Sequence, residues 1–476
     1  MTPYAQETAV ITGKTLIDWG FAPGPWFSEG IAAAQAAAAR GQDARRAVAA
    51  IAPKPVATLS LRKAGALPYH LNIREENEGD ARNIAAVEAH MTELMRVPTI
   101  RSGAVMPDAC PAGQAPGTIP VGGVIATENA IHPGFHSADI CCSMALTSFR
   151  DADPTAILDA GMKLSHFGGG GRPRGAQMRP PAAILEAMRE NLFLSKLTSA
   201  AIEHFATQGD GNHFFYVGRR ASTGAVTLVT HHGSRKPGAL LYKAGMALAE
   251  ATTRVLSPET PRHNAWIVAD SPEGEAYWEA LQIIRQWTRA NHYAIHDLIA
   301  EALGLAPVDR FWNEHNFVFR RDDGLFYHAK GATPAYAGFS ADDTGLTLIP
   351  LNMGEPILIT RGKDALNSLG FSPHGAGRNF SRSAFLRAQS ETPEQQLAAI
   401  RRRIDARFFS GVPDASELPA AYKSAQTVRA QLGEFGLCEI VDTVEPVGCI
   451  MAGDWQVNAP WRKRKVAKED QTDTIG

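Results

Sequence analysis

The sequence predicts a mixed α/β fold, in which helices and strands build one large domain. From Ala104 onward, short β-branched runs alternate with glycine and proline, which is typical of strands separated by turns. Longer segments with helical spacing of apolar residues lie between them, such as the one after Ser271. The chain has 476 residues, 45% hydrophobic and 20% charged, and this is the composition of a large globular protein.

Composition also limits the class of protein. No run of about 18 apolar residues is present, so we expect no transmembrane helix. The first residues lack the basic and apolar regions of a signal peptide, so we expect a cytoplasmic protein. Five cysteines, an odd number, favour metal or thiol chemistry in a reducing compartment. The net charge of −2 gives no global sign of nucleic-acid binding, so any such surface must be local.

The N-terminal part differs in composition from the rest. Residues 23–51 are rich in Ala and Arg, Pro25 precedes a helix-like run over 26–40, and Asp43 can cap a second helix. We predict a helical N-terminal extension over residues 1–65, a main domain over 66–458 and a basic tail over 459–476. We expect the extension to pack on the main domain, with docking or nucleic-acid binding as the alternative.

The main domain has recognisable elements. The pattern predicts strands at 121–125, 226–230, 317–319 and 346–349, and helices at 84–95, 393–408 and 422–435. Ser271 and Pro272 begin a helix that runs towards His296. His292 and His296 share one face of that helix, but no acid lies between them, so we favour a structural role over a metal site.

A turn after the first of these strands combines a carboxylate with a thiol. Asp139 and Cys142 stand three residues apart in the segment Ala-Asp-Ile-Cys-Cys-Ser at 138–143. From one tight turn both side chains could reach one metal, or one each of two close metals. The alternative is a buried structural pair, because free cysteine often packs like a small hydrophobic residue.

Four histidine motifs make the metal interpretation stronger. Each has a histidine beside Asn or Gly and close to a strand, at 209–214, 231–235, 314–317 and 374–378. Imidazole and thiolate suit Mn²⁺, Zn²⁺, Co²⁺ or Fe²⁺ better than Mg²⁺. With Asp139 and Cys142, three histidines would supply two metals if one ligand bridges them.

The last motif differs from the other three. The backbone of Gly375, Ala376 and Gly377 can approach a phosphate closely, and Arg378 can hold it with two hydrogen bonds. His374 beside such a loop can act as a nucleophile. A glycine-rich turn with a capping histidine is the alternative.

The ordered set of motifs resembles the RtcB-type RNA-splicing ligase family, from about Ala104 to the 450s. The segments that carry the resemblance are residues 104–108, 139–142, 211–214, 231–235, 315–316, 328–333, 350–354, 374–378, 381–382 and 421–423. The resemblance implies a fold with a central metal-binding cleft. It also implies an enzyme that joins an RNA 3′-phosphate or 2′,3′-cyclic phosphate end to a 5′-hydroxyl end, with GTP and two Mn²⁺ ions as cofactors. The implied partner is RNA with broken or cleaved tRNA-like ends, and no membrane is involved.

The resemblance also assigns roles to residues. The implied metal ligands are Asp139, Cys142 as the bridge, His213, His231 and His315. His374 would accept the guanylate. The implied nucleotide-binding residues are Asn212, His315, Asn316, Asn352, Met353, Gly354, His374, Gly375, Ala376, Gly377 and Tyr422, of which Tyr422 would stack on the base. Asp108, Lys330 and Arg378 would line the cleft near phosphates.

The sequence departs from the family pattern at several of these motifs. The family has Gly at the positions of Cys141 and Ser143, and His at that of Cys110. Polar positions that contact the nucleotide in the family carry Tyr216, Asn352, Ile357 and Met451 here. Because a site loses discrimination when its hydrogen-bonding groups are replaced, we expect the base preference to be relaxed or altered.

Three functions follow for comparison. The first is the nucleotide- and Mn²⁺-dependent RNA ligase. The second is a metal-dependent RNA phosphoesterase without nucleotidyl transfer. The third is a non-catalytic RNA-end binding protein, which would have little need for a thiolate-bridged metal pair.

Overall fold

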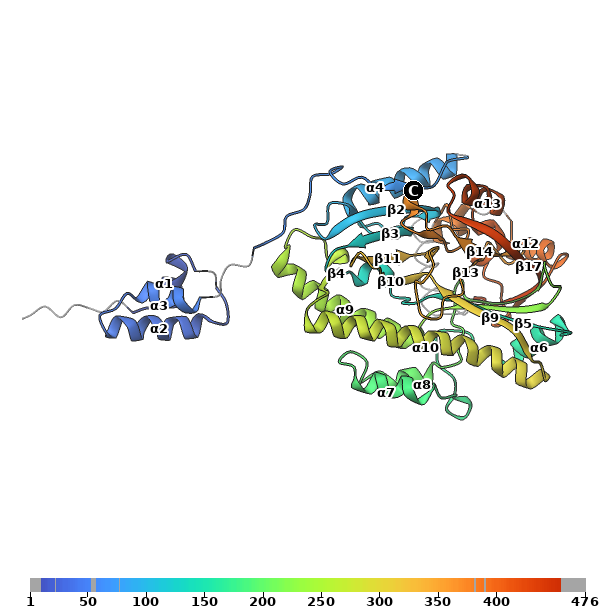
Figure 1. Cartoon of the computed structure of the whole chain (residues 1–476), viewed down its shortest axis with the longest axis horizontal. Helices are drawn as coiled ribbons and strands as arrows, with labels where there is room; N and C mark the ends of the chain where they lie inside the picture. Colours follow the sequence, from blue (N-terminus) through green and yellow to red (C-terminus); the bar gives the residue numbers. More distant parts are fainter. Residues whose placement is uncertain are drawn as a thin grey trace, which may run out of the picture. The chain divides into compact units, whose positions relative to one another are not determined.

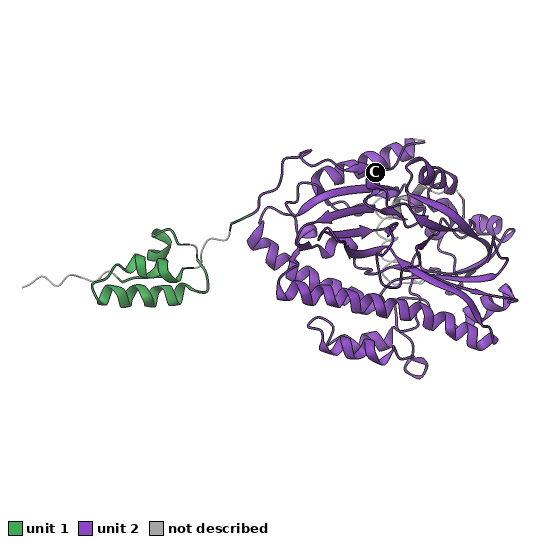
Figure 2. Cartoon of the chain, in the orientation of Figure 1, with its two compact units in different colours: residues 1–58 green, residues 59–476 purple. Residues whose placement is uncertain are grey.

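A computed structural model describes residues 10–21, 23–52, 57–76, 78–380, 382–388 and 391–454. It has two compact units, residues 1–58 and 59–476 (Figure 2). The basic tail predicted over 459–476 lies outside the described residues. None of the described helices is long and apolar enough to cross a membrane.

The first unit is a small helical module. Its helices are α1 (Gly13–Asp18), α2 (Phe27–Ala39) and α3 (Ala44–Ile51), and they pack around Leu16, Ala34 and Val48. Asp43 caps α3 by accepting a hydrogen bond from the Arg46 amide, as the sequence predicted. The short helix α1, which starts at a Thr12–Thr15 capping box, was not predicted.

The larger sheet of the second unit supplies most of the site. Among the described residues it has the order β13, β14, β17, β6, β7, β5, β9, with neighbours antiparallel, and β16 pairs with β17 in parallel. The strands are β5 (Ser143–Phe149), β6 (Phe214–Arg220), β7 (Val226–His232), β9 (Pro307–Glu314), β13 (Leu346–Ile349), β14 (Ile357–Gly362), β16 (Asp405–Phe408) and β17 (Cys438–Met451). The sheet curls, so that Asn313 on one edge accepts a hydrogen bond from the Leu348 amide on the other.

A second sheet lies beside it. Its order is β1 (His70–Leu71), β2 (Ile100–Cys110), β3 (Val121–Thr127), β11 (Phe326–Lys330), β10 (Asn316–Arg320). Only His315 separates β9 of the large sheet from β10 of this one. Two short pairs complete the described strands: β12 (Ala332–Pro334) with β15 (Phe371–Pro373), and β4 (Ala130–Ile131) with β8 (Ile267–Val268).

Helices cover the sheets. They are α4 (Glu78–Leu94), α5 (Pro133–His136), α6 (Pro154–Leu164), α7 (Ala182–Glu190), α8 (Thr198–Glu203), α9 (Arg235–Leu256), α10 (Pro272–Leu303), α11 (Arg382–Ala388), α12 (Pro393–Arg401) and α13 (Ala425–Glu434). Figure 1 shows α9 and α10 running along one side of the strands, with α7 and α8 beyond α10. Helix α10 begins at the Ser271 cap and ends at Gly304, whose φ of 65° closes it.

One predicted helix is partly wrong. The helix expected over 393–408 ends at Arg401, and the chain continues as strand β16. Ala406 and Phe408 of this strand and Ile404 just before it are buried, while Asp405 is exposed, which is the period of a strand. Pairing with β17 therefore overrides the helical spacing that Leu397, Ile400 and Ile404 suggest.

A buried ion pair holds α10 against the end of β9. The Arg285 guanidinium donates to Glu314, whose side chain is fully buried, and to Asp342 at 2.9 Å. It also lies over the Trp312 ring, 4.7 Å from its centroid. A buried carboxylate that loses its cation is costly, because neither water nor another charge replaces the cation. The pair therefore fixes the strand end that leads into His315.

This geometry predicts a large effect of Arg285→Met. The unpaired Glu314 should lower the free energy of unfolding by about 3–5 kcal/mol, and adding Glu314→Gln should recover part of the loss. Urea unfolding at pH 7 measures both. The control is Arg289→Met, one turn later on α10 and also paired with Asp342 but half-exposed, which should cost about 1 kcal/mol or less. Equal losses for the two single variants would contradict the prediction.

Candidate metal and nucleotide site

Four adjacent strands deliver histidine and cysteine to the same end of the large sheet. Cys142 and His213 directly precede β5 and β6, His231 lies near the end of β7, and His315 directly follows β9. Neighbours in the order β6, β7, β5, β9 are antiparallel, so the start of one strand lies beside the end of the next. The register places Phe214 opposite His231, and Ser143 opposite both His232 and Glu314. The predicted ligands therefore converge.

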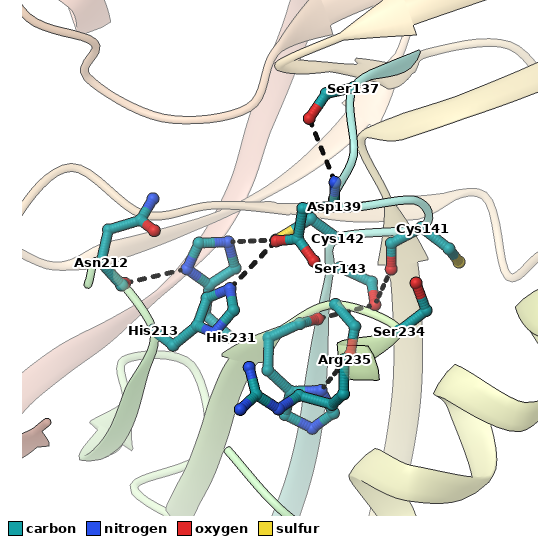
Figure 3. A network of polar contacts seen from close by, with 12 residues as sticks. Ser137, Asp139, Cys141, Cys142, Ser143, Asn212, His213, His231, Ser234 and Arg235 are labelled. Atoms are coloured by element: carbon teal, nitrogen blue, oxygen red, sulfur yellow. Dashed lines mark hydrogen bonds and ion pairs between the residues drawn. The ribbon is translucent and has the colours of Figure 1, made fainter. Parts of the chain in front are cut away.

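The potential ligand atoms form two groups that share one thiol. The groups are Cys142, His231 and His315, and Asp139, Cys142 and His213, with the potential ligand atoms of each group within 4.8 Å of one another. Cys142 Sγ lies 3.2 Å from His231 Nε2 and 3.7 Å from His213 Nε2. His213 Nε2 is 3.1 Å from Asp139 Oδ2, and His231 Nε2 is 3.1 Å from His315 Nε2. Figure 3 shows Asp139, Cys142, His213 and His231 facing one another.

Electrostatics suits these groups to a cation. Burial lowers the pKa of His231 to about 3 and that of His315 well below its usual range, so both rings are neutral and keep a lone pair. The Asn212 carbonyl lies 3.1 Å from His231 Nδ1, which places the proton there and leaves Nε2 free.

The two remaining donors behave differently. Burial, followed by the charge of Asp139, raises the pKa of the Cys142 thiol, so the thiol is protonated when no cation is bound. A coordinated cation has the opposite effect, because it deprotonates the thiol that binds it. Burial opposes ionisation of Asp139, but the interactions with His213, followed by those with Cys142 and Arg235, together outweigh it and lower the carboxyl pKa. Nδ1 of His213 and Nδ1 of His315 are buried and have no hydrogen-bond partner among the residues that the structure describes. This donor set fits borderline transition ions.

The turn that carries Asp139 and Cys142 is tightly constrained. Cys141 has a φ of 56°, in the left-handed region, which accounts physically for the glycine expected there in the family. Its amide donates to the Asn316 carbonyl at 2.7 Å, and the Cys142 carbonyl accepts from the His315 amide at 2.9 Å. In Figure 3 the Cys141 sulfur points away from the potential ligands, so only Cys142 faces them.

His292 and His296 lie behind the site in hydrogen bonds to hydroxyls. Thr230 Oγ1 contacts His292 Nδ1 at 2.7 Å and His296 Nε2 at 2.8 Å. Ser143 and Thr147 bind the other nitrogens of the two rings at 3.0 and 2.7 Å. These bonds confirm the structural role predicted for the pair, because all four ring nitrogens have hydroxyl partners. The Ser143 hydroxyl, at a position where the family has Gly, belongs to this network.

His374 directly follows β15 and contacts a buried carboxylate. Its Nδ1 lies 2.7 Å from Asp108 Oδ2, and its amide donates to the same oxygen at 3.1 Å. Asp108 is fully buried in β2. Its contact with Nδ1 leaves Nε2 with the lone pair, and the His374 ring lies 4.8 Å from that of His315. The sequence indicated Asp108 as a cleft acid but not as the partner of His374.

Two glycines make room for this histidine. A Cβ on Gly331 would come within 3.0 Å of the His374 ring, and one on Gly377 would come within 1.9 Å of the Asp108 carbonyl oxygen. Both have positive φ, so a side chain would also strain the backbone. The Asn316 side chain holds the first of them by accepting from the Gly331 amide at 2.7 Å.

A cavity of about 980 Å³ opens over these residues. Among the described residues it is lined by all the predicted site residues except Asp108, His213 and Gly354, which do not reach its surface. Lys330 lies on its wall, donates to the Ile119 carbonyl, and has its pKa lowered by burial to about 8. Asn352 accepts from the Gly354 amide at 3.0 Å and so shapes the loop at 350–354.

Sequence reasoning missed Glu417, which organises one wall of the cavity. This buried carboxylate accepts from Arg378 and Arg382, each at 2.7 Å, and from the Tyr422 hydroxyl at 2.5 Å. Arg378 also lies over the Tyr422 ring, 4.5 Å from its centroid. The only sequence signal was an acid beside apolar Leu418. Arg378 and Tyr422 therefore form one unit rather than two independent contacts.

The closeness of Gly233 to Asp139 gives a test of the site. A Cβ at position 233 would lie 2.0 Å from Asp139 Oδ1, so Gly233→Ala must displace this potential ligand. We expect the affinity for Mn²⁺ to fall about 10–100-fold, as is usual when the support of a metal ligand is lost. Titration calorimetry of the whole protein measures the change. The control is Gly433→Ala in α13, where the added Cβ meets nothing within 4 Å. Equal Mn²⁺ affinity in the two variants would contradict the prediction.

Comparison with known proteins places these residues in a family. Residues 153–452 match the family model described as tRNA-splicing ligase RtcB, a range that contains all four histidines of the site but not Asp139 or Cys142. The chain is 27% identical over 324 residues to tRNA-splicing ligase RtcB of Thermococcus kodakarensis, which is 60% of this chain and 64% of that relative.

Two bacterial relatives are covered more fully. The chain is 27% identical to RNA-splicing ligase RtcB of Escherichia coli, over 69% of this chain and 86% of the relative. It is 26% identical to RNA-splicing ligase RtcB of Mycobacterium tuberculosis, over 70% of this chain and 93% of the relative. It spans only about three fifths of the archaeal relatives from T. kodakarensis and Aeropyrum pernix. The family match extends over more than half of the sequence, and the chain belongs to the RtcB family.

Proposed function

We propose that the protein is an RNA ligase that joins a 3′-phosphate or 2′,3′-cyclic phosphate end to a 5′-hydroxyl end, through a nucleotide carried on His374. The observation that carries the proposal is the placement of His374. It touches a buried carboxylate through Nδ1, lies beside the potential ligand His315, and faces a cavity with a glycine-rich loop. The relatives named RNA- or tRNA-splicing ligase support it.

The proposed reaction uses Nε2 of His374 as the nucleophile. This nitrogen attacks the α-phosphorus of GTP, the new N–P bond forms, and the bond to pyrophosphate breaks. Asp108 keeps the proton on Nδ1 and stabilises the positive charge that develops on the ring. For a 2′,3′-cyclic phosphate end, water would first open the ring to give a 3′-phosphate. The nucleotide then passes from His374 to the RNA 3′-phosphate as the N–P bond breaks, and attack by the 5′-hydroxyl releases the nucleoside monophosphate.

The residues that would hold two Mn²⁺ ions are the two groups sharing Cys142. Bound ions would supply charge neutralisation and orientation of phosphate oxygens, as two close metals do in phosphoryl transfer. The chain's own contribution is a fixed set of donors: His231 on β7, His213 and His315 next to strand ends, and Asp139 and Cys142 in the turn before β5. Lys330 adds a positive charge on the cavity wall next to Gly331.

The cavity also bears on base selectivity. Part of its wall is Phe214, Leu351, Met353, Ile357 and Met451. The Tyr216 hydroxyl there already donates to the Val444 carbonyl at 2.9 Å. A base edge against such a wall meets few hydrogen-bonding groups, and this supports a relaxed preference among nucleoside triphosphates.

The proposed setting is cytoplasmic RNA repair or tRNA processing. All five cysteines are free thiols, which suits a reducing compartment. Cys142 as a metal ligand would depend on that state, since oxidation removes its donor pair.

The shared thiol predicts a distinctive pattern of metal loss. After loading with Mn²⁺ and desalting, metal analysis should give about two ions per chain for the native protein and about none for Cys142→Ala. His213→Ala and His315→Ala should each retain about one, because each belongs to one group only. Cys438→Ala, another buried cysteine, is the control and should retain both. Equal loss in the cysteine and histidine variants would contradict a bridging thiolate.

Labelling with α-³²P nucleoside triphosphates tests the nucleophile. With Mn²⁺, the native protein should become labelled, and His374→Ala should not. Asp108→Asn should slow labelling about 100-fold or more, because the wrong proton arrangement on the ring is then favoured. Exposed Asp322→Asn is the control for an Asp-to-Asn change.

The outcomes separate the alternatives. Similar labelling by ATP and GTP would support the relaxed base preference, and labelling by GTP alone would overturn it. No label from any triphosphate would overturn the ligase proposal. Opening of a cyclic phosphate without a triphosphate, and without ligation, would indicate a phosphoesterase.

A further inference from the structure

A hollow on the surface of the second unit is rich in arginine. It is lined by Arg401, Arg402, Arg403, Ile404, Asp405, Ala406, Arg407 and Val447, and its volume is about 540 Å³. Helix α12 ends here and β16 begins, and β16 pairs in parallel with β17 from Gly448 to Met451. The first three arginines are exposed, and we refer to them as the arginine triplet.

The charges of the hollow are not balanced. Arg407 is neutralised by Asp405 at 2.6 Å and Asp159 at 2.7 Å. Across the described part of the chain, no ion pair involves a member of the triplet. Arg401 donates to the Ala406 carbonyl at 3.2 Å, and Arg403 donates to the Gly354 carbonyl at 3.4 Å. These contacts position the guanidinium groups but leave their charge uncompensated.

The contact between Arg403 and the Gly354 carbonyl connects the hollow with the cavity. Gly354 belongs to the loop at 350–354, whose Pro350, Leu351, Asn352 and Met353 line the cavity beside His374. Arg403 of the triplet therefore contacts a loop whose other residues face the proposed reaction. A helix C-terminus accounts for one basic residue through its dipole, but not for three in succession around a hollow.

We propose that the arginine triplet binds phosphates of the RNA strand whose end occupies the cavity. This inference rests on the proposed function, because it takes the strand to be RNA. Guanidinium groups suit the task, since their planar donors match phosphate oxygens. The overall charge of −2 gives no general attraction for RNA, so a local group of this kind supplies it.

The test is RNA binding by the full chain over a range of salt concentrations. A fluorescent single-stranded RNA with a 3′-phosphate is titrated with native protein and with Arg401→Gln/Arg402→Gln/Arg403→Gln. At about 0.1 M salt the variant should bind about tenfold more weakly or worse, and the slope of log K against log salt should be smaller by about 2, as expected for three lost phosphate contacts on a single strand.

Two further variants make the result specific. Arg179→Gln/Arg189→Gln/Lys196→Gln removes the same charge from exposed positions near α7 that do not line the cavity, and should bind RNA like native protein. Arg401→Lys/Arg402→Lys/Arg403→Lys keeps the charge and should retain affinity within about threefold. The proposal would be overturned if the variant with three glutamines at 401–403 had the RNA affinity and salt slope of the native protein. An equal loss of RNA affinity in the variant at 179, 189 and 196 would also overturn it.

The result is separable from the proposed function. Labelling of His374 in the native protein needs no RNA, so failure of labelling would overturn the ligase reaction without affecting the binding result. Native protein that is labelled but binds this RNA with no salt dependence would overturn the triplet proposal alone.

Discussion

The antiparallel register of β6, β7, β5 and β9 is the constraint on which the site depends. Neighbouring strands lie about 4.8 Å apart, so side chains at one end of four adjacent strands can form the two groups that share Cys142. A slip of one residue in any of these pairs would turn a ligand to the opposite face of the sheet. The complete pairing from Ser143 to Phe149 with β7 leaves no freedom for such a slip. The sheet therefore brings these segments together: His231 lies on β7, Cys142, His213 and His315 lie next to the ends of β5, β6 and β9, and Asp139 lies in the turn before β5.

Buried polar groups behind the sheet support this register. His292 and His296 pack against β5 and β7 through Ser143, Thr147 and Thr230, and the Arg285–Glu314 pair fixes the end of β9. Each of these groups would be costly to bury alone, because it would lose water without gaining a partner. Their mutual satisfaction specifies one arrangement of α10 on the sheet, and the ligands on the other side of the strands inherit that precision.

Much of the fold and site was predictable from sequence, for local reasons. Strands at 226–230, 317–319 and 346–349 and the start of α10 followed from side-chain alternation and capping chemistry, and the structure confirms them. Convergence of Asp139, Cys142 and the histidines was implied by the resemblance to the RtcB family, while the strand pairing that produces it is a long-range property. The error at 393–408 arose because β17, forty residues away, decides the conformation of residues 405–408. The Asp108–His374 contact and the ion pairs of Glu417 with Arg378 and Arg382 were missed for the same reason, since these partners are distant in sequence.

The left-handed backbone at Cys141 has a consequence for the chemistry of the neighbouring thiol. Two chemically identical groups stand side by side in the sequence, and the conformation of one peptide decides which of them meets the cation. Their Cα atoms are also fixed about 3.8 Å apart by the bond between them, below the range in which a disulfide is relaxed, and the thiols diverge. Cys141 therefore neither competes with Cys142 for metal nor forms a disulfide with it. The fold can hold a second thiol next to the metal site without interfering with the thiol that would bind metal.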